Sequence, residues 1–206
     1  MTIENSGRNP QAEPDGPDER AGQRESALRL IAGRHPADRG EQATQAEFAA
    51  AFDAVDAPLR RDDAPAHATA SCFAFDPSLR SILLVLHRKG RFWVQPGGHL
   101  EPSDRSVPAA ALRELAEETG VVPPEPTDVV AVDLDHHALA SGFGRCASHL
   151  DFGVAVLLDP AARLTVSAES DDVRWWPVDA LPENEAPGLT ARIRAMIRRI
   201  EGHDRA

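Results

Sequence analysis

The chain has 206 residues, a formal net charge of −11 at pH 7 and 42% hydrophobic residues, which is typical of a globular domain with an extension. This acidic balance argues against nonspecific nucleic-acid binding, which needs clustered Lys and Arg. No stretch approaches the roughly 20 apolar residues of a membrane span. We therefore expect neither nucleic acid nor membrane as a partner. We expect a cytoplasmic location, because residues 1–9 lack the apolar core of a signal peptide.

The chain contains two cysteines, Cys72 and Cys146. Two cysteines do not make a disulfide framework. We expect both to be small buried side chains and not zinc ligands.

The first 60 residues divide into two segments of different composition. Residues 1–24 are rich in Pro, Gly and polar residues and almost lack large apolar ones, which predicts a disordered tail. In residues 25–60 the apolar residues recur at helical spacings, with an interruption at residues 33–40 that contains Pro36. This pattern predicts a helical extension packed on the main body.

The main domain is expected to cover residues 65–200, where the hydrophobic pattern becomes strand-like. Runs rich in β-branched and apolar residues, bounded by turn residues, indicate strands. We expect them at residues 68–76, 81–88, 91–95, 129–135, 150–158 and 173–178. A final helix is expected at residues 190–200, where apolar residues follow one stripe.

A central helix is predicted over residues 107–119. At 100° per residue its apolar residues share one arc, and its charged residues occupy the opposite one. Ser106 can cap its N-terminus, Pro108 suits the first turn, and Gly120 suits a left-handed C-terminal cap.

The polar face of this helix carries Glu114, Glu117 and Glu118. Like charges three or four residues apart destabilise a helix by a few tenths of a kcal/mol per pair, and Arg113 can neutralise only one of them. Mg²⁺ typically shares a few carboxylates with substrate phosphates, so a bound divalent cation would offset the repulsion. A solvated surface helix is the alternative for the glutamates alone. The bare Pro96-Gly97-Gly98 backbone ahead of the helix favours a ligand site.

These residues resemble the signature of the Nudix hydrolase superfamily. Its second half, Arg-Glu-aliphatic-any-Glu-Glu-any-Gly-aliphatic, is matched throughout by residues 113–121. In the first half, five residues separate Gly98 from Asp104, where the family has Glu, and eight residues instead of seven precede Arg113. The loop is thus one residue longer and its acid one methylene shorter.

The resemblance implies an α+β fold, a Nudix-like α/β/α sandwich with a mixed β-sheet, to which the N-terminal helical extension adds. It implies a hydrolase that cleaves a phosphoanhydride bond in a nucleoside diphosphate linked to another moiety, with Mg²⁺, or alternatively Mn²⁺, as cofactor. The catalytic and metal-binding roles fall on the Gly97 carbonyl, Glu114, Glu117 and Glu118. Arg113 would orient the glutamates, and either Glu114 or Glu169 would be the general base.

Four further residues are expected to bind the small-molecule diphosphate substrate: Arg88, His99, His149 and Asp151. For His149 and Asp151, which alternate on one strand face, a structural hydrogen-bonded pair is an equally good interpretation. His99 is either a phosphate contact or a surface residue.

The Asp104 carboxylate reaches roughly 1.5 Å less far than that of Glu, whereas metal–oxygen distances tolerate about 0.2 Å. Either the inserted residue moves the loop inward so that Asp104 binds the metal directly, or Asp104 supports the metal ligands through a contact. We expect the supporting contact, because Pro102 and Pro108 restrict how far the loop can bend.

Two other functions stay open at this stage. One is an isomerase of an allylic diphosphate on the same fold, which would need an acid or thiol pair above carbon. The other is a catalytically silent nucleotide-binding module. The oligomeric state is open as well, with a homodimer as the alternative to a monomer.

Overall fold

A computed structural model describes residues 17–139, 146–168 and 170–203. The N-terminal helices are α1 (Pro17–Ala32) and α2 (Arg39–Asp53), and α3 (Val107–Thr119) and α4 (Leu189–His203) follow later. The strands are β1 (Ala66–Phe75), β2 (Ser81–His87), β3 (Trp93–Val94), β4 (Gly97–His99), β5 (Ala131–Ala138), β6 (Ser148–Leu157) and β7 (Ser170–Pro177). A short 3₁₀ helix, η1 (Pro126–Asp128), precedes β5. In this described part of the chain, no helix has the length and apolar character needed to cross a membrane.

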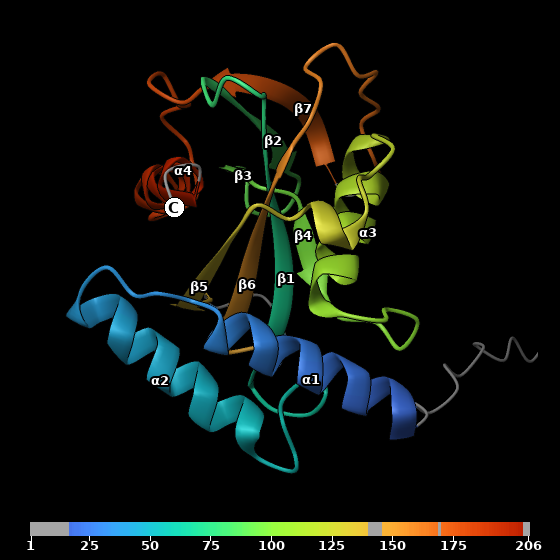
Figure 1. The fold of residues 1–206 in the computed structure, drawn as a ribbon. Helices are drawn as coiled ribbons and strands as arrows, with labels where there is room; N and C mark the ends of the chain where they lie inside the picture. The colour runs from blue at the N-terminus through green and yellow to red at the C-terminus, as the bar shows by residue number, and fades with distance from the viewer. Residues whose placement is uncertain (1–16, 140–145, 169, 204–206) are drawn as a thin grey trace, which may run out of the picture.

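One mixed sheet organises the fold. Its main path runs β3-β2-β1-β6-β5, while β4 pairs with β1 and β7 pairs with β2. The β1–β6 pair is parallel, and the other pairs are antiparallel. Figure 1 shows α3 and α4 on opposite sides of the sheet, with α1 and α2 packed across its end. The predicted α/β/α sandwich with a mixed sheet and an N-terminal helical extension is confirmed.

Burial on both faces explains why β1 is apolar along most of its length. Cys72 and Ala74 point into the core that α1, α2 and α3 cover, whereas Phe73 and Phe75 point into the core under α4. Successive strand residues face opposite sides of a sheet. A strand covered on both faces therefore reads as a nearly continuous hydrophobic run.

The predicted disordered tail is wrong for residues 17–24, which belong to α1. Gln23 is fully buried, and its amide donates to the carbonyl oxygens of Glu101 at 2.7 Å and Asp104 at 2.5 Å. These hydrogen bonds fix the middle of α1 on the loop that precedes α3. A hydrophobic pattern does not register such contacts, because the anchor is an amide.

Candidate active site

The helix α3 forms where the sequence predicts it, with both predicted caps. The Ser106 hydroxyl accepts a hydrogen bond from the Ala109 N–H at 3.2 Å, and Gly120 adopts the left-handed conformation with φ of 71°. Ala111, Leu112 and Leu115 are buried against the sheet. The apolar stripe therefore fixes the helix on the core and turns the glutamate-bearing face away from it.

The strand β4 brings a side-chain-free backbone against this polar face. A Cβ on Gly97 would lie 2.6 Å from the Cβ of Ser71, and one on Gly98 would lie 2.4 Å from Glu114 Oε1. Gly97 thus permits close pairing with β1, and Gly98 leaves the space that the Glu114 carboxylate occupies. The Gly97 N–H also donates to Glu118 Oε1 at 3.2 Å.

Arg113 is the centre of the polar network on α3. Its Nη1 donates to Glu114 Oε1 at 3.0 Å and to Glu117 Oε2 at 2.9 Å. Its Nη2 donates to the His99 carbonyl oxygen at 3.0 Å. One guanidinium group therefore connects two of the glutamates to the end of β4.

Asp104 holds the other side of the same guanidinium group. Arg113 Nε donates to Asp104 Oδ1 at 3.0 Å and Nη2 donates to Oδ2 at 3.1 Å, while the Glu101 N–H donates to Oδ2 at 2.8 Å. Asp104 is 5% exposed. Burial lowers the pKa of Arg113, but the hydrogen bonds to Asp104 and the charges of Glu114, Asp104 and Glu101 outweigh it, so that the pKa is raised above its ordinary value.

The glutamates open onto a cavity of about 430 Å³. Its described lining contains the carboxylates of Glu101, Glu114, Glu117 and Glu118 and the guanidinium of Arg113, next to Gly97, Gly98, His99, Ser167 and Ala168. Within this lining the carboxylates outnumber the cationic group. A diphosphate could enter such a cavity only together with cations.

The donor set fits a hard divalent cation. It offers carboxylate and backbone carbonyl oxygens, the ligands that Mg²⁺ and Mn²⁺ prefer. Glu114, Glu117 and Glu118, with the Gly97 carbonyl, would hold the ion. The Gly97–Gly98 backbone leaves room for the Glu114 carboxylate, which a Cβ on Gly98 would displace.

Other residues predicted to bind substrate lie apart from this lining. The side chain of Arg88 donates to Asp171 Oδ1 at 2.9 Å and to the Ser170 carbonyl oxygen at 3.1 Å. Asp151 is 3% exposed. Their substrate contacts stay predictions, and Glu169 lies outside the described residues.

The Asp151 carboxylate lies in a buried polar network on the sheet. It accepts hydrogen bonds from the hydroxyls of Thr69 at 2.9 Å and Ser71 at 2.7 Å, and from Arg192 Nη2 at 2.7 Å. Both of its oxygens thus have protein donors. This arrangement favours the structural interpretation of Asp151 over a substrate contact.

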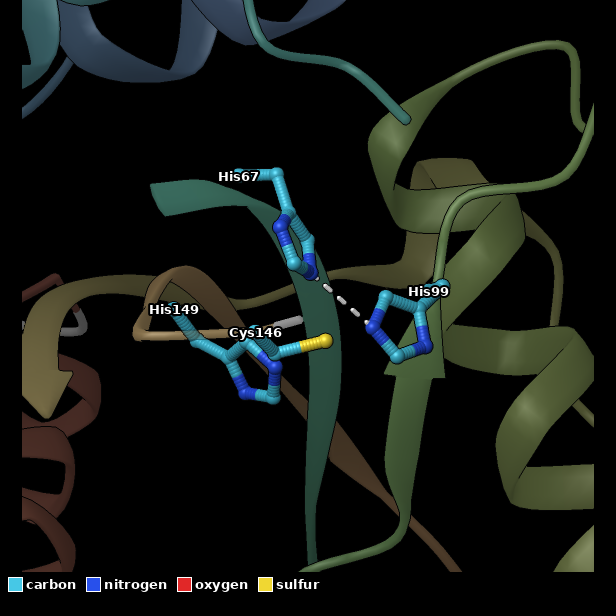
Figure 2. Close-up of side chains that lie close together, drawn as sticks. All are labelled: His67, His99, Cys146 and His149. Carbon is cyan, nitrogen blue, oxygen red and sulfur yellow. Dashed lines mark hydrogen bonds between the residues drawn. The ribbon is translucent and has the colours of Figure 1, made fainter. Parts of the chain in front are cut away.

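His99 and His149 lie together with two residues, His67 and Cys146, for which the sequence predicted no role in a site. Figure 2 shows their rings beside His67 and the thiol of Cys146. Burial lowers the pKa of His99 to about 4, helped by the charge of His67, and burial lowers that of His149 to about 4, helped by His99 and His137. Both rings are therefore neutral at pH 7.

The expectation that both cysteines are small buried side chains holds for one of them. Cys72 is fully buried, and this burial raises the pKa of its thiol. Cys146 is only half-buried and lies beside the histidines. The signal that could have drawn attention to it is His149, which two intervening residues separate from Cys146, a spacing close to that of paired zinc ligands.

Comparison with known proteins identifies the fold and the family. Two solved structures of a bifunctional NMN adenylyltransferase/ADP ribose pyrophosphatase from Francisella tularensis are similar. One matches with a TM-score of 0.50 and 18% identity over 64% of this chain and 40% of that protein. The other, complexed with AMP and a Mn ion, matches with a TM-score of 0.51 and 17% identity over 76% of this chain and 49% of that protein. The chain thus spans less than half the length of these proteins.

A match to a family model assigns the chain to a family. Residues 65–200 match the family model of the NUDIX domain, a range that contains the glycine pair, the glutamates and Arg113. The chain therefore belongs to the Nudix hydrolase superfamily.

Proposed function

We propose that this chain is a Mg²⁺-dependent hydrolase that cleaves the phosphoanhydride bond of a nucleoside diphosphate linked to another moiety. The observation that carries the proposal is the convergence of Glu114, Glu117 and Glu118 with the Gly97–Gly98 backbone on one acidic cavity. When bound there, the ion supplies positive charge to the diphosphate and polarises a phosphoryl oxygen. Mn²⁺ has the same ligand preferences and is the alternative cofactor.

The protein's own groups position the reacting parts. Arg113 holds Glu114 and Glu117, and Asp104 holds Arg113, so that the carboxylates are oriented before substrate arrives. The Gly97 N–H orients Glu118. Preorganised charges of this kind need little rearrangement during the reaction.

A carboxylate of this site would accept the proton of the water that attacks phosphorus. Glu114 is a candidate because its carboxylate lies against Gly98 at the cavity wall. Glu169 is the other candidate, on the grounds of the family resemblance. Each glutamate is replaced by Gln, and the pH dependence of turnover is measured for both variants. The variant that has lost the base should no longer show the fall in rate at low pH that protonation of the base causes.

The two rival functions receive less support from the geometry. An isomerase would need an acid or thiol pair above carbon, yet Cys72 is fully buried and Cys146 lies with the histidines, and neither belongs to the described lining of the acidic cavity. A silent binding module would have no need for the ordered set of glutamates and Arg113. The cytoplasmic location and a homodimer stay predictions.

A substrate panel tests the proposal. The protein is incubated with Mg²⁺ or Mn²⁺ and ADP-ribose, dinucleoside polyphosphates, nucleotide sugars, nucleoside triphosphates or an allylic diphosphate, and the products are separated by chromatography. Hydrolysis of a diphosphate-linked nucleoside supports the proposal. Rearrangement of the allylic diphosphate without hydrolysis, or nucleotide binding without turnover on any compound, would overturn it.

A further inference from the structure

A second cluster of metal-ligating side chains lies at one end of β1, β4 and β6. His67 of β1 and His149 of β6 are direct partners in the parallel pair. His99 of β4 lies opposite Thr69, two residues along β1 from His67. Cys146 comes two residues before β6 begins. Pairing of the three strands thus gathers residues that are far apart in the chain.

The spacing of these side chains matches the size of a transition-metal site. One ligand atom from each of His67, His99, Cys146 and His149 can be chosen so that all lie within 4.8 Å of one another. His67 Nε2 and His99 Nε2 are 3.1 Å apart. In a tetrahedral zinc site with Zn–N distances of about 2.0–2.1 Å, ligand nitrogens are about 3.3 Å apart. The His67–His99 pair is close to this spacing, and the chosen ligand atoms of Cys146 and His149 lie within 4.8 Å of it.

The hydrogen bond of His67 orients its ring as in a metal site. The Nδ1–H lies 2.8 Å from the Ala64 carbonyl oxygen, which can only accept. The proton therefore sits on Nδ1, and the lone pair of Nε2 points toward His99. Metal-bound histidines are typically held in this way, with the second ring nitrogen donating to a backbone carbonyl or a carboxylate.

His149 supplies an independent observation. Its Nε2 is buried and has no hydrogen-bond partner among the described residues. A buried nitrogen without a partner costs free energy. Without a metal ion, the His99 Nε2–H donates to His67 Nε2, which accounts for those two rings. To bind the ion, His99 would carry its proton on Nδ1 instead, and His149 Nε2 would gain the partner that it lacks. Coordination of an ion would satisfy it.

We propose that His67, His99, Cys146 and His149 bind one Zn²⁺ ion. The imidazole and thiolate ligands suit Zn²⁺, whereas the oxygen ligands of the acidic cavity suit Mg²⁺. Because four protein ligands leave no open position, the ion is structural. The ion would connect β4 to β1 and β6. Strand β4 carries the two glycines that line the acidic cavity, and its His99 carbonyl accepts a hydrogen bond from Arg113.

Zinc content of the purified full chain tests the proposal. The protein, without a histidine tag, is stripped with a chelator, reloaded with Zn²⁺, passed through a desalting column and analysed by mass spectrometry of the metal. We expect about one Zn²⁺ per chain, and at least a tenfold loss of affinity in His67→Ala, Cys146→Ser and His149→Ala. The matched control is His137→Ala, whose ring lies 5.5 Å from that of His149 but whose Nδ1 pairs with Asp135.

Two results would overturn the ligand assignment. One is zinc binding by the wild type at far below one ion per chain. The other is a loss in His137→Ala as deep as that in His149→Ala. A further variant, Glu118→Gln, separates this site from the acidic cavity: it is expected to keep its zinc even when hydrolysis is lost. Zinc that disappears in Glu118→Gln but persists in His149→Ala would contradict the proposal.

Cobalt spectroscopy and thermal stability give readouts that do not depend on activity. Co²⁺ in place of Zn²⁺ should give visible bands of a four-coordinate ion and a near-ultraviolet thiolate charge-transfer band, and Cys146→Ser should lose the latter. Because a ligand that binds only the folded state stabilises it, Zn²⁺ at a hundred times its Kd should raise Tm by about 5–10 °C. A six-coordinate cobalt spectrum without the thiolate band, or an unchanged Tm, would refute the site.

Discussion

The loop acid Asp104 gives a prediction whose size follows from its contacts. In Asp104→Asn only one side-chain oxygen remains to accept from Arg113, so at least one charge-assisted hydrogen bond is lost, at about 1.5–3 kcal/mol. Removing a whole buried partner costs about 3–5 kcal/mol, but Arg113 keeps Glu114 and Glu117. We expect the free energy of unfolding to fall by about 2–3 kcal/mol, which lowers Tm by about 5–10 °C in a chain of this size.

Activity and metal dependence of the same variant distinguish a supporting contact from direct ligation. Because Asp104 acts through Arg113, turnover should fall about 10- to 100-fold, with an unchanged concentration of Mg²⁺ for half-maximal rate. The control is Glu101→Gln, whose carboxylate is 4.0 Å from the same guanidinium and mostly exposed, so that its stability should change by less than about 0.5 kcal/mol. If Asp104→Asn needs a higher Mg²⁺ concentration for half-maximal rate while its Tm is unchanged, Asp104 is a direct metal ligand and this prediction is wrong.

Three further predictions concern the surroundings of the site. Gln23→Ala should lower the free energy of unfolding by about 1–3 kcal/mol, seen as a lower Tm. Gln42→Ala, on the exposed side of α2, should leave Tm unchanged. Equal Tm values for the two variants would mean that Gln23 does not anchor α1. Gly98→Ala should leave Tm within about 2 °C but cut turnover at least about tenfold, because its Cβ displaces the Glu114 carboxylate; normal turnover would contradict this packing. Asp151→Asn should lower Tm and leave KM unchanged, because both carboxylate oxygens accept hydrogen bonds from the protein. A raised KM at unchanged Tm would show instead that Asp151 binds substrate.

The central helix was predictable because its signals are local. Ser106, Pro108 and Gly120 mark its ends within a few residues of the helix itself, and its apolar stripe has one period throughout. The strand β4 was not expected, because three residues that include Gly97 and Gly98 carry no periodic pattern. Its existence depends on pairing with β1, which lies more than 20 residues earlier in the chain.

Long-range contacts limited the prediction of the site as well. The glutamates and Arg113 share one helix face, so their spacing alone brings them together. His67 and Cys146 meet His99 only through the pairing of β1 with β4 and β6. The buried position of Asp151 is likewise set by Arg192 of α4. Spacing along one element does not contain that information.

The turnover of Glu118→Gln on the best substrate of the panel tests most directly whether the α3 glutamates form the metal site of a hydrolase. The rate should fall about 10²- to 10⁴-fold at saturating Mg²⁺, because lost charge stabilisation costs several kcal/mol and each 1.4 kcal/mol is a factor of ten. Tm should stay near that of the wild type, and the exposed Glu201→Gln on α4 should keep full activity. A Glu118→Gln variant that retains more than about a third of the wild-type rate would contradict the account.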